Sequence, residues 1–93
     1  MTLALTSTVI RTEGVMTAPV DHEIVILNMA SNNYISLDAI GRRIWELLAT
    51  EQTVTDACRK LSLEFDATEE QIAADLIPFL TELEKDGLVR VLS

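Results

Sequence analysis

Residues 21–38, DHEIVILNMASNNYISLD, hold the pattern that decides the fold: two apolar stretches separated by a polar turn. The first stretch, residues 23–29, is rich in β-branched side chains and too short for a typical helix, so it predicts a strand. Residues 31–33, Ser-Asn-Asn, favour a turn, because Asn tolerates left-handed backbone geometry. Residues 34–37 return as a short strand, so the whole segment predicts an antiparallel hairpin.

The returning strand of this hairpin has two chemically different faces. Tyr34 and Ser36 fall on one face, and Ile35 and Leu37 fall on the other. Because successive side chains of a strand point to opposite sides, we expect Ile35 and Leu37 to face the core.

Upstream of the hairpin, residues 3–11 are rich in Thr, Val, Ile and Leu and predict a further strand. Residues 12–14, Thr-Glu-Gly, suit the turn that follows it. The N-terminal half is therefore expected to form a three-stranded antiparallel sheet.

Downstream of the hairpin, three helix starts carry capping residues. Asp38 is placed to cap a helix that runs to about residue 49, and Thr53 is placed to cap a second one. Thr68 and Gln71 fit a capping box for a third and longest helix, which Gly87 terminates. The apolar tail, residues 88–92, suits either a short strand or packing under the helices.

Three strands followed by three helices predict an α+β fold of winged helix-turn-helix type. We expect one domain over residues 1–93, with its first few residues loose. The composition agrees with a compact globular chain, since 48% of the residues are hydrophobic and 24% are charged.

Charge and cysteine content exclude several classes of partner. Fifteen acidic residues against seven basic ones give a net charge of −8, which repels phosphate backbones and anionic membranes. We therefore expect no nucleic-acid partner and no membrane partner. Cys58 is the one cysteine, and the sequence shows neither a secretory signal nor an apolar run of membrane-spanning length, so a cytoplasmic location is expected.

Three segments in this order, DHEIVILN (residues 21–28), NYISLD (residues 33–38) and GRRIWELL (residues 41–48), resemble the PqqD-like family. Asp75, Phe79, Leu83 and Gly87 resemble the last helix of that family and its ending. Members of the family are known as RiPP recognition elements. A chain of this length looks most like the stand-alone leader-binding proteins of lasso-peptide biosynthesis, which deliver a precursor to a leader peptidase and a cyclase.

The resemblance implies that a leader peptide docks as an extra strand beside the third strand, in the cleft between that strand and the third helix. The implied positions are Asn33, Tyr34, Ile35, Ser36 and Leu37 on the strand, and Ile72, Asp75, Leu76, Phe79 and Glu82 on the helix. In that arrangement the carboxylates would attract a basic leader residue, and the apolar side chains would receive its anchors. The implied partners are the precursor leader, the leader peptidase and possibly the cyclase.

Several of these residues also have a purely structural interpretation. Ile72, Leu76 and Phe79 belong to an apolar stripe that is first of all a core face, so only residues at its edge would serve a peptide. Trp45 and Cys58 are expected in the core. Tyr34 is left open between leader, partner enzyme and solvent.

Two rival functions remain for comparison. A winged-helix transcription regulator is the alternative, but the third helix holds Lys85 as its one basic residue, which opposes DNA binding. A small enzyme is disfavoured, because the sequence has no glycine-rich phosphate loop, no metal-ligand spacing and no nucleophile with a matched base. We expect neither catalysis nor a cofactor.

Overall fold

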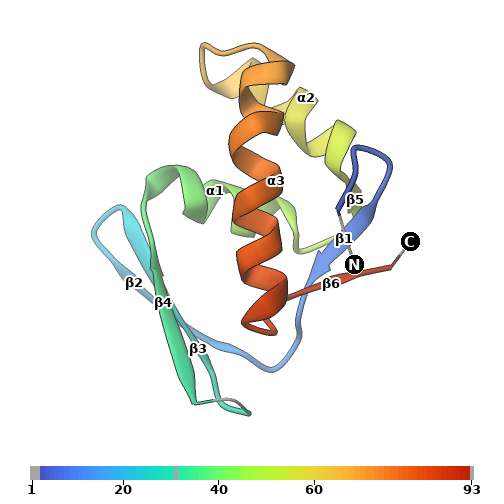
Figure 1. Ribbon diagram of the computed structural model, residues 1–93. Coiled ribbons are helices and arrows are strands. Elements are labelled where there is room, and N and C mark those ends of the chain that lie inside the picture. The colour runs from blue at the N-terminus through green and yellow to red at the C-terminus, as the bar shows by residue number, and fades with distance from the viewer. Residues whose placement is uncertain (1–2, 31, 93) are drawn as a thin grey trace.

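The computed structural model describes residues 3–30 and 32–92, and within them it has six strands and three helices (Figure 1). The α+β class, with an N-terminal three-stranded antiparallel sheet followed by three helices, is confirmed. The elements are β1 (Thr8–Arg11), β2 (Met16–Val20), β3 (Glu23–Asn28), β4 (Asn33–Leu37), α1 (Ala39–Leu47), β5 (Gln52–Thr53), α2 (Val54–Glu64), α3 (Glu69–Lys85) and β6 (Val89–Val91).

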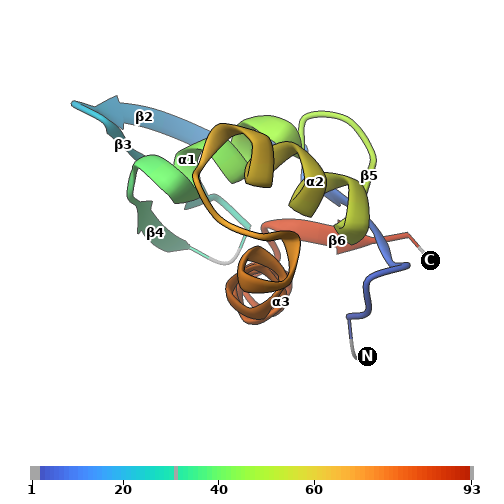
Figure 2. The same ribbon diagram turned by 90° about the horizontal axis from the view of Figure 1, so that it is seen from above.

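The strands form two separate sheets, ordered β2-β3-β4 and β5-β1-β6, and all of their pairings are antiparallel. In Figure 1 the first sheet lies at the lower left and the second at the right, with α3 in front between them. From above, in Figure 2, α3 is seen nearly end-on and α1 and α2 lie on the other side of β6. The β2-β3-β4 sheet therefore has two unpaired edges, one along β2 and one along β4.

The sequence prediction was wrong about which strand completes the hairpin sheet. The strand expected over residues 3–11 is shorter, since β1 covers Thr8–Arg11, and it pairs with β5 and β6 instead. The third member of the hairpin sheet is β2, which the sequence analysis missed because MTAPV contains Ala and Pro. Both residue types are depleted in strands, and Pro19 is tolerated because β2 is an edge strand.

The β3–β4 hairpin is formed as predicted, and its inner face is the predicted one. Ile24 pairs with Leu37, and Ile26 pairs with Ile35. Leu37 is buried and Ile35 is partly buried, whereas Tyr34 is 76% exposed on the opposite face. The alternation of residues 34–37 therefore predicted the faces of β4 correctly.

All three helices begin at the predicted capping residues. The Asp38 Oδ1 accepts a hydrogen bond from the Gly41 amide at 2.8 Å, and the Thr53 hydroxyl caps α2 in the same way. At the start of α3 both halves of the capping box are formed, because Thr68 and Gln71 bond to each other's backbone amides. These caps fix where α1 and α3 start relative to the hairpin sheet.

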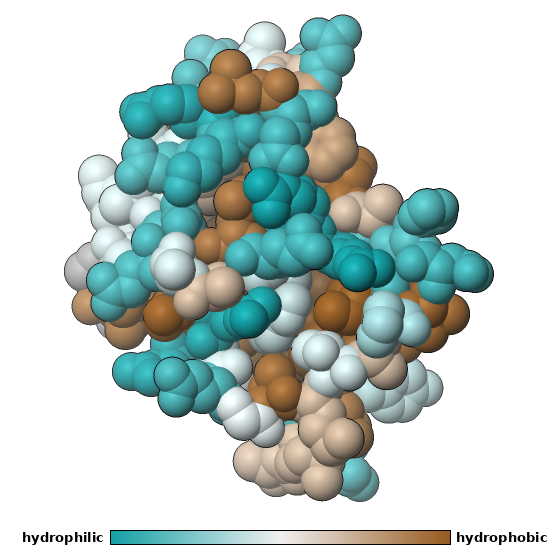
Figure 3. Space-filling view, turned by 180° about the vertical axis from the view of Figure 1, so that it is seen from behind, coloured by the Kyte–Doolittle hydropathy of each residue, from teal (hydrophilic) through white to brown (hydrophobic). Residues whose placement is uncertain are grey.

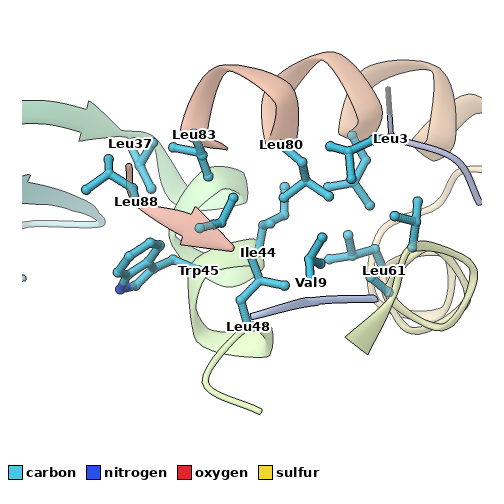
Figure 4. Packing of buried hydrophobic residues seen from close by; sticks show 14 of the residues in the cluster. Leu3, Val9, Leu37, Ile44, Trp45, Leu48, Leu61, Leu80, Leu83 and Leu88 are labelled. Carbon is cyan, nitrogen blue, oxygen red and sulfur yellow. The ribbon is translucent and has the colours of Figure 1, made fainter. Parts of the chain in front are cut away.

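One hydrophobic core joins the helices to both sheets (Figure 4). Leu80 and Leu83 of α3 point from the helix toward Ile44 and Leu37 in this view. Trp45 and Cys58 are buried, as predicted. Leu3 also packs in the core. The expectation of a loose start concerns Met1 and Thr2, which lie outside the described residues.

The apolar tail, whose state the sequence left open, forms β6 and pairs with β1. Within residues 3–30 and 32–92, no helix has the length and apolarity needed to span a membrane.

Candidate functional site

A hollow of about 530 Å³ opens between the C-terminal end of β4, the start of α1, the end of α2 and the N-terminal half of α3. Six of the ten sequence-predicted site residues line it. They are Ser36, Leu37, Ile72, Asp75, Leu76 and Phe79. The structure thus brings together the end of the predicted strand and the predicted face of the helix.

The other four predicted residues lie outside this hollow. Asn33, Tyr34 and Ile35 belong to β4 but precede the stretch that borders the hollow. Glu82 is exposed further along α3, where its carboxylate lies 4.0 Å from the Lys85 ammonium. Glu82 therefore does not rim the hollow as the sequence analysis expected, because it is one to two helical turns beyond Asp75 and Phe79.

Eight lining residues were missed by the sequence analysis, because they come from elements that the expected cleft did not include. They are Glu23, Asp38, Ile40, Gly41, Ile44, Leu61, Phe65 and Ala67. One of them, Ile40 in the first turn of α1, is 52% exposed, so a large apolar side chain beside the hollow is left in contact with solvent. The end of α2 could not be placed beside β4 without the tertiary structure.

The apolar lining is layered by depth. Leu37, Ile44 and Leu76 are buried residues of the core and form the floor. Ile72 and Phe79 are partly buried and form the wall along α3. The core interpretation of the α3 stripe is therefore correct for Leu76, and its edge residues Ile72 and Phe79 face the hollow with part of their surface accessible.

Gly41 lets α1 approach β4 closely at this point. A Cβ atom built on Gly41 would lie 3.0 Å from the Leu37 Cβ and 3.4 Å from the Asp38 Oδ1. The first contact is tighter than nearly all carbon contacts in proteins, so Leu37 or α1 would have to move by a few tenths of an ångström. A side chain here would thus change the floor of the hollow.

Three carboxylates, those of Glu23, Asp38 and Asp75, line the same hollow, and no Lys, Arg or His is among its described lining residues. Asp38 uses one oxygen to cap α1. All three residues are exposed, so their attraction for a positive charge is screened by solvent and salt. The hollow therefore combines an apolar floor with an acidic lining.

An ion pair joins α1 to the end of α2 near the hollow. The Arg43 Nε lies 2.7 Å from the Glu64 Oε1, next in sequence to the lining residue Phe65. The hydrogen bond from Arg43 lowers the pKa of the Glu64 carboxyl, and the same bond raises the pKa of Arg43. Away from the hollow, burial raises the pKa of the Cys58 thiol, which keeps it protonated and unreactive.

The two edges of the hairpin sheet differ in their ability to accept another strand. β2 carries Pro19, which has no amide hydrogen to donate. β4, with the sequence Asn-Tyr-Ile-Ser-Leu, has no proline and no charged residue. Proline and charged residues, above all lysine, usually protect an edge strand from pairing with another strand. The unprotected edge is the one whose end borders the hollow.

The surface seen from behind the view of Figure 1 is mixed. In Figure 3 brown hydrophobic residues are scattered among teal hydrophilic ones from the top of the view to its lower half. Among the described residues, no group of three or more His, Cys, Asp or Glu side chains is arranged to hold a metal ion.

Comparison with known proteins gives two matches. A family model described as coenzyme PQQ synthesis protein D (PqqD) matches residues 23–89. The chain is also similar to a solved structure of TbiB1 in complex with the TbiA(beta) leader peptide, with a TM-score of 0.78 and 28% sequence identity over 87% of this chain and 94% of that one. No curated protein matches the chain by sequence.

Proposed function

The chain belongs to the PqqD family, and from this premise we propose that it binds the leader segment of a ribosomally synthesised precursor peptide. The observation that carries the proposal is the unprotected β4 edge, which ends at an apolar hollow with acidic lining. The likeness to TbiB1, whose structure contains a leader peptide, supports the same function.

The leader binds by strand addition. An extended peptide beside β4 satisfies the outward amide and carbonyl groups of residues 33–37, which gives affinity without regard to sequence. β2 is a poorer template because of Pro19. Asn33, Tyr34 and Ile35 thus contribute mainly through their backbone, whereas Ser36 and Leu37 also border the hollow.

Specificity comes from side chains that enter the hollow. An apolar leader residue packs on Leu76 between Ile72 and Phe79, and Phe79 acts as the aromatic anchor. A basic leader residue close to that anchor is attracted by Asp75, with Glu23 and Asp38 nearby in the same lining. The preferred leader therefore has apolar and basic side chains within a few residues of each other.

The chain acts as an adaptor and performs no catalysis of its own. It holds the leader and docks on a leader peptidase of a lasso-type pathway, with the cyclase as a second candidate partner. Holding the substrate and the enzyme in one complex raises the local substrate concentration at the enzyme. A cytoplasmic site of action agrees with the synthesis of the precursor on ribosomes.

The charge of α3, which would be the DNA-recognition helix of a winged-helix regulator, argues against the transcription-regulator alternative. Glu69, Glu70, Asp75, Glu82 and Glu84 lie on α3, and Lys85 is its one basic residue. Phosphate backbones repel such a helix.

The proposal is tested by calorimetric titration of the purified chain with the synthetic leader of the precursor encoded beside its gene. We expect saturable one-to-one binding with a Kd below about 10 μM. A leader of the same composition in scrambled order is the matched control and should not bind. Equal binding of both peptides, or binding of neither, would contradict the proposal.

A further inference from the structure

The C-terminal end of α3 forms a complete Schellman motif, which fixes the direction in which the chain leaves the helix. The Leu88 amide donates to the Leu83 carbonyl at 2.8 Å, and the Gly87 amide donates to the Glu84 carbonyl at 3.0 Å. Gly87 has a φ of +75°, the left-handed geometry that this motif requires. The carbonyls of Asp86 and Gly87 lie just beyond the helix and face the hairpin sheet.

Asn28, the last residue of β3, ties this helix end to the sheet. Its Nδ2 donates to the Asp86 carbonyl at 3.1 Å and to the Gly87 carbonyl at 3.4 Å. Its Oδ1 accepts from the Ala30 amide at 3.0 Å and so orients the side-chain amide. A Cβ atom at Gly87 would lie 3.0 Å from the Asn28 Nδ2, which shows how closely the two elements meet.

This contact lies at one end of the space between β4 and α3. Asn28 pairs directly with Asn33, the first residue of β4. Leu37, at the other end of β4, borders the hollow together with Ile72 and Phe79. In Figure 1 α3 runs to the right of β4, with its C-terminal end at the bottom, toward the lower ends of β3 and β4.

We propose that Asn28 is a positioning residue of the peptide site, which fixes the end of α3 on β3 and so sets the spacing between α3 and the β4 edge. This inference rests on the proposed function. A small displacement of α3 at Asn28 is carried along the helix to Phe79, because Phe79 lies on the same side of Pro78 as the helix end, and the helix is continuous from Phe79 to Lys85. The wall of the hollow then no longer matches a strand added to β4.

Asn28→Asp tests the inference, because it replaces the Nδ2 donor by an oxygen that faces the carbonyl oxygens of Asp86 and Gly87. The other side-chain oxygen still accepts the hydrogen bond from the Ala30 amide. We expect leader affinity to fall by about 3- to 10-fold, the size of effect that one lost hydrogen bond produces. In the free chain, amide hydrogen exchange should quicken selectively over residues 83–88.

Two controls separate positioning from charge and from general stability. Asn32→Asp makes the same charge change in the same hairpin, at a φ of +58° that Asp also adopts. Ser7→Ala removes a hydrogen bond of the turn that precedes β1, in which the Ser7 Oγ accepts from the Ala4 amide at 3.0 Å. Both variants should bind the leader as the wild type does.

If Asn28→Asp fails to fold, Gly87→Ala disturbs the same contact from the helix side and should give the same loss of affinity. Unchanged affinity in folded Asn28→Asp, or exchange that quickens evenly over the whole chain, would overturn the inference. A wild-type chain that binds no leader would instead contradict the proposed function, and with it any positioning role in binding. The exchange measurement on the free chain still tests the link between Asn28 and α3.

Discussion

At the scale of single residues, partly buried side chains at the edge of the core carry the proposed specificity. Leu76 is 2% exposed and belongs to the core, so its replacement would damage the fold and reveal little about binding. Phe79 packs against the same core but retains accessible surface in the hollow. The position of Phe79 therefore allows its binding role to be separated from its structural one.

Phe79→Ala should weaken leader binding by about 1 to 3 kcal/mol while the domain stays folded, because an aromatic anchor in a desolvated pocket dominates such an interface. Calorimetric titration measures the loss, and circular dichroism checks the fold. Leu63→Ala is the matched control, since Leu63 on α2 is 83% exposed and does not line the hollow. Equal affinity of Phe79→Ala and wild type would refute the anchor role.

At the scale of elements, local signals in the sequence were enough to locate the helices and the β3–β4 hairpin. Asp38, Thr53 and Thr68 began their helices as predicted, because side-chain capping depends on a few neighbouring residues. β2 was missed because its composition is untypical of a strand. The pairing of β1 with β5 and β6 joins distant segments, and periodicity in the sequence holds no information about such contacts.

The candidate site likewise contains some residues that the sequence indicated and others that it missed. The candidate positions on β4 and α3 were implied by the family resemblance, and six of them border the hollow. Phe65 and Ala67, at the junction of α2 and α3, were missed because their place beside β4 depends on how the helices pack.

Strand addition at β4 predicts a pattern of backbone dependence in the leader. N-methylation of single leader amides should weaken binding at alternate positions, because every second amide of an added strand points toward β4. The intervening amides point to solvent and tolerate the methyl group. Competition binding with a set of singly methylated peptides measures the pattern. A loss that is equal at all positions, or absent, would contradict strand addition.

The Arg43–Glu64 ion pair predicts how stability depends on pH. Because folding lowers the pKa of Glu64, the pair stabilises the fold above the ordinary carboxyl pKa of about 4.3, and this contribution is lost as the pH falls through the lower folded pKa. Urea unfolding of wild type and Glu64→Gln should differ at pH 7, and the difference should shrink below about pH 4.

The control for this effect is Glu51→Gln, because Glu51 is exposed and forms no ion pair in the described part of the chain. Its difference from wild type should show no comparable acid-dependent loss. A Glu64→Gln difference that stays constant from pH 7 to acid would contradict the ion-pair explanation.

At the scale of the whole molecule, the two sheets have different tasks. The β5-β1-β6 sheet joins the two ends of the chain, and the β2-β3-β4 sheet presents an open edge beside α3. The net charge of −8 favours a basic ligand over a nucleic acid, in agreement with the acidic lining of the hollow. These features agree with the proposed capture of an extended peptide between β4 and α3.

The central claim is tested most directly by solution NMR of the ¹⁵N-labelled chain during titration with the leader peptide. The account predicts saturable shift changes concentrated at residues 33–37 of β4 and residues 72–79 of α3, with new exchange protection of the outward β4 amides. Changes concentrated along β2 or on the β5-β1-β6 sheet, with β4 unaffected, would contradict it.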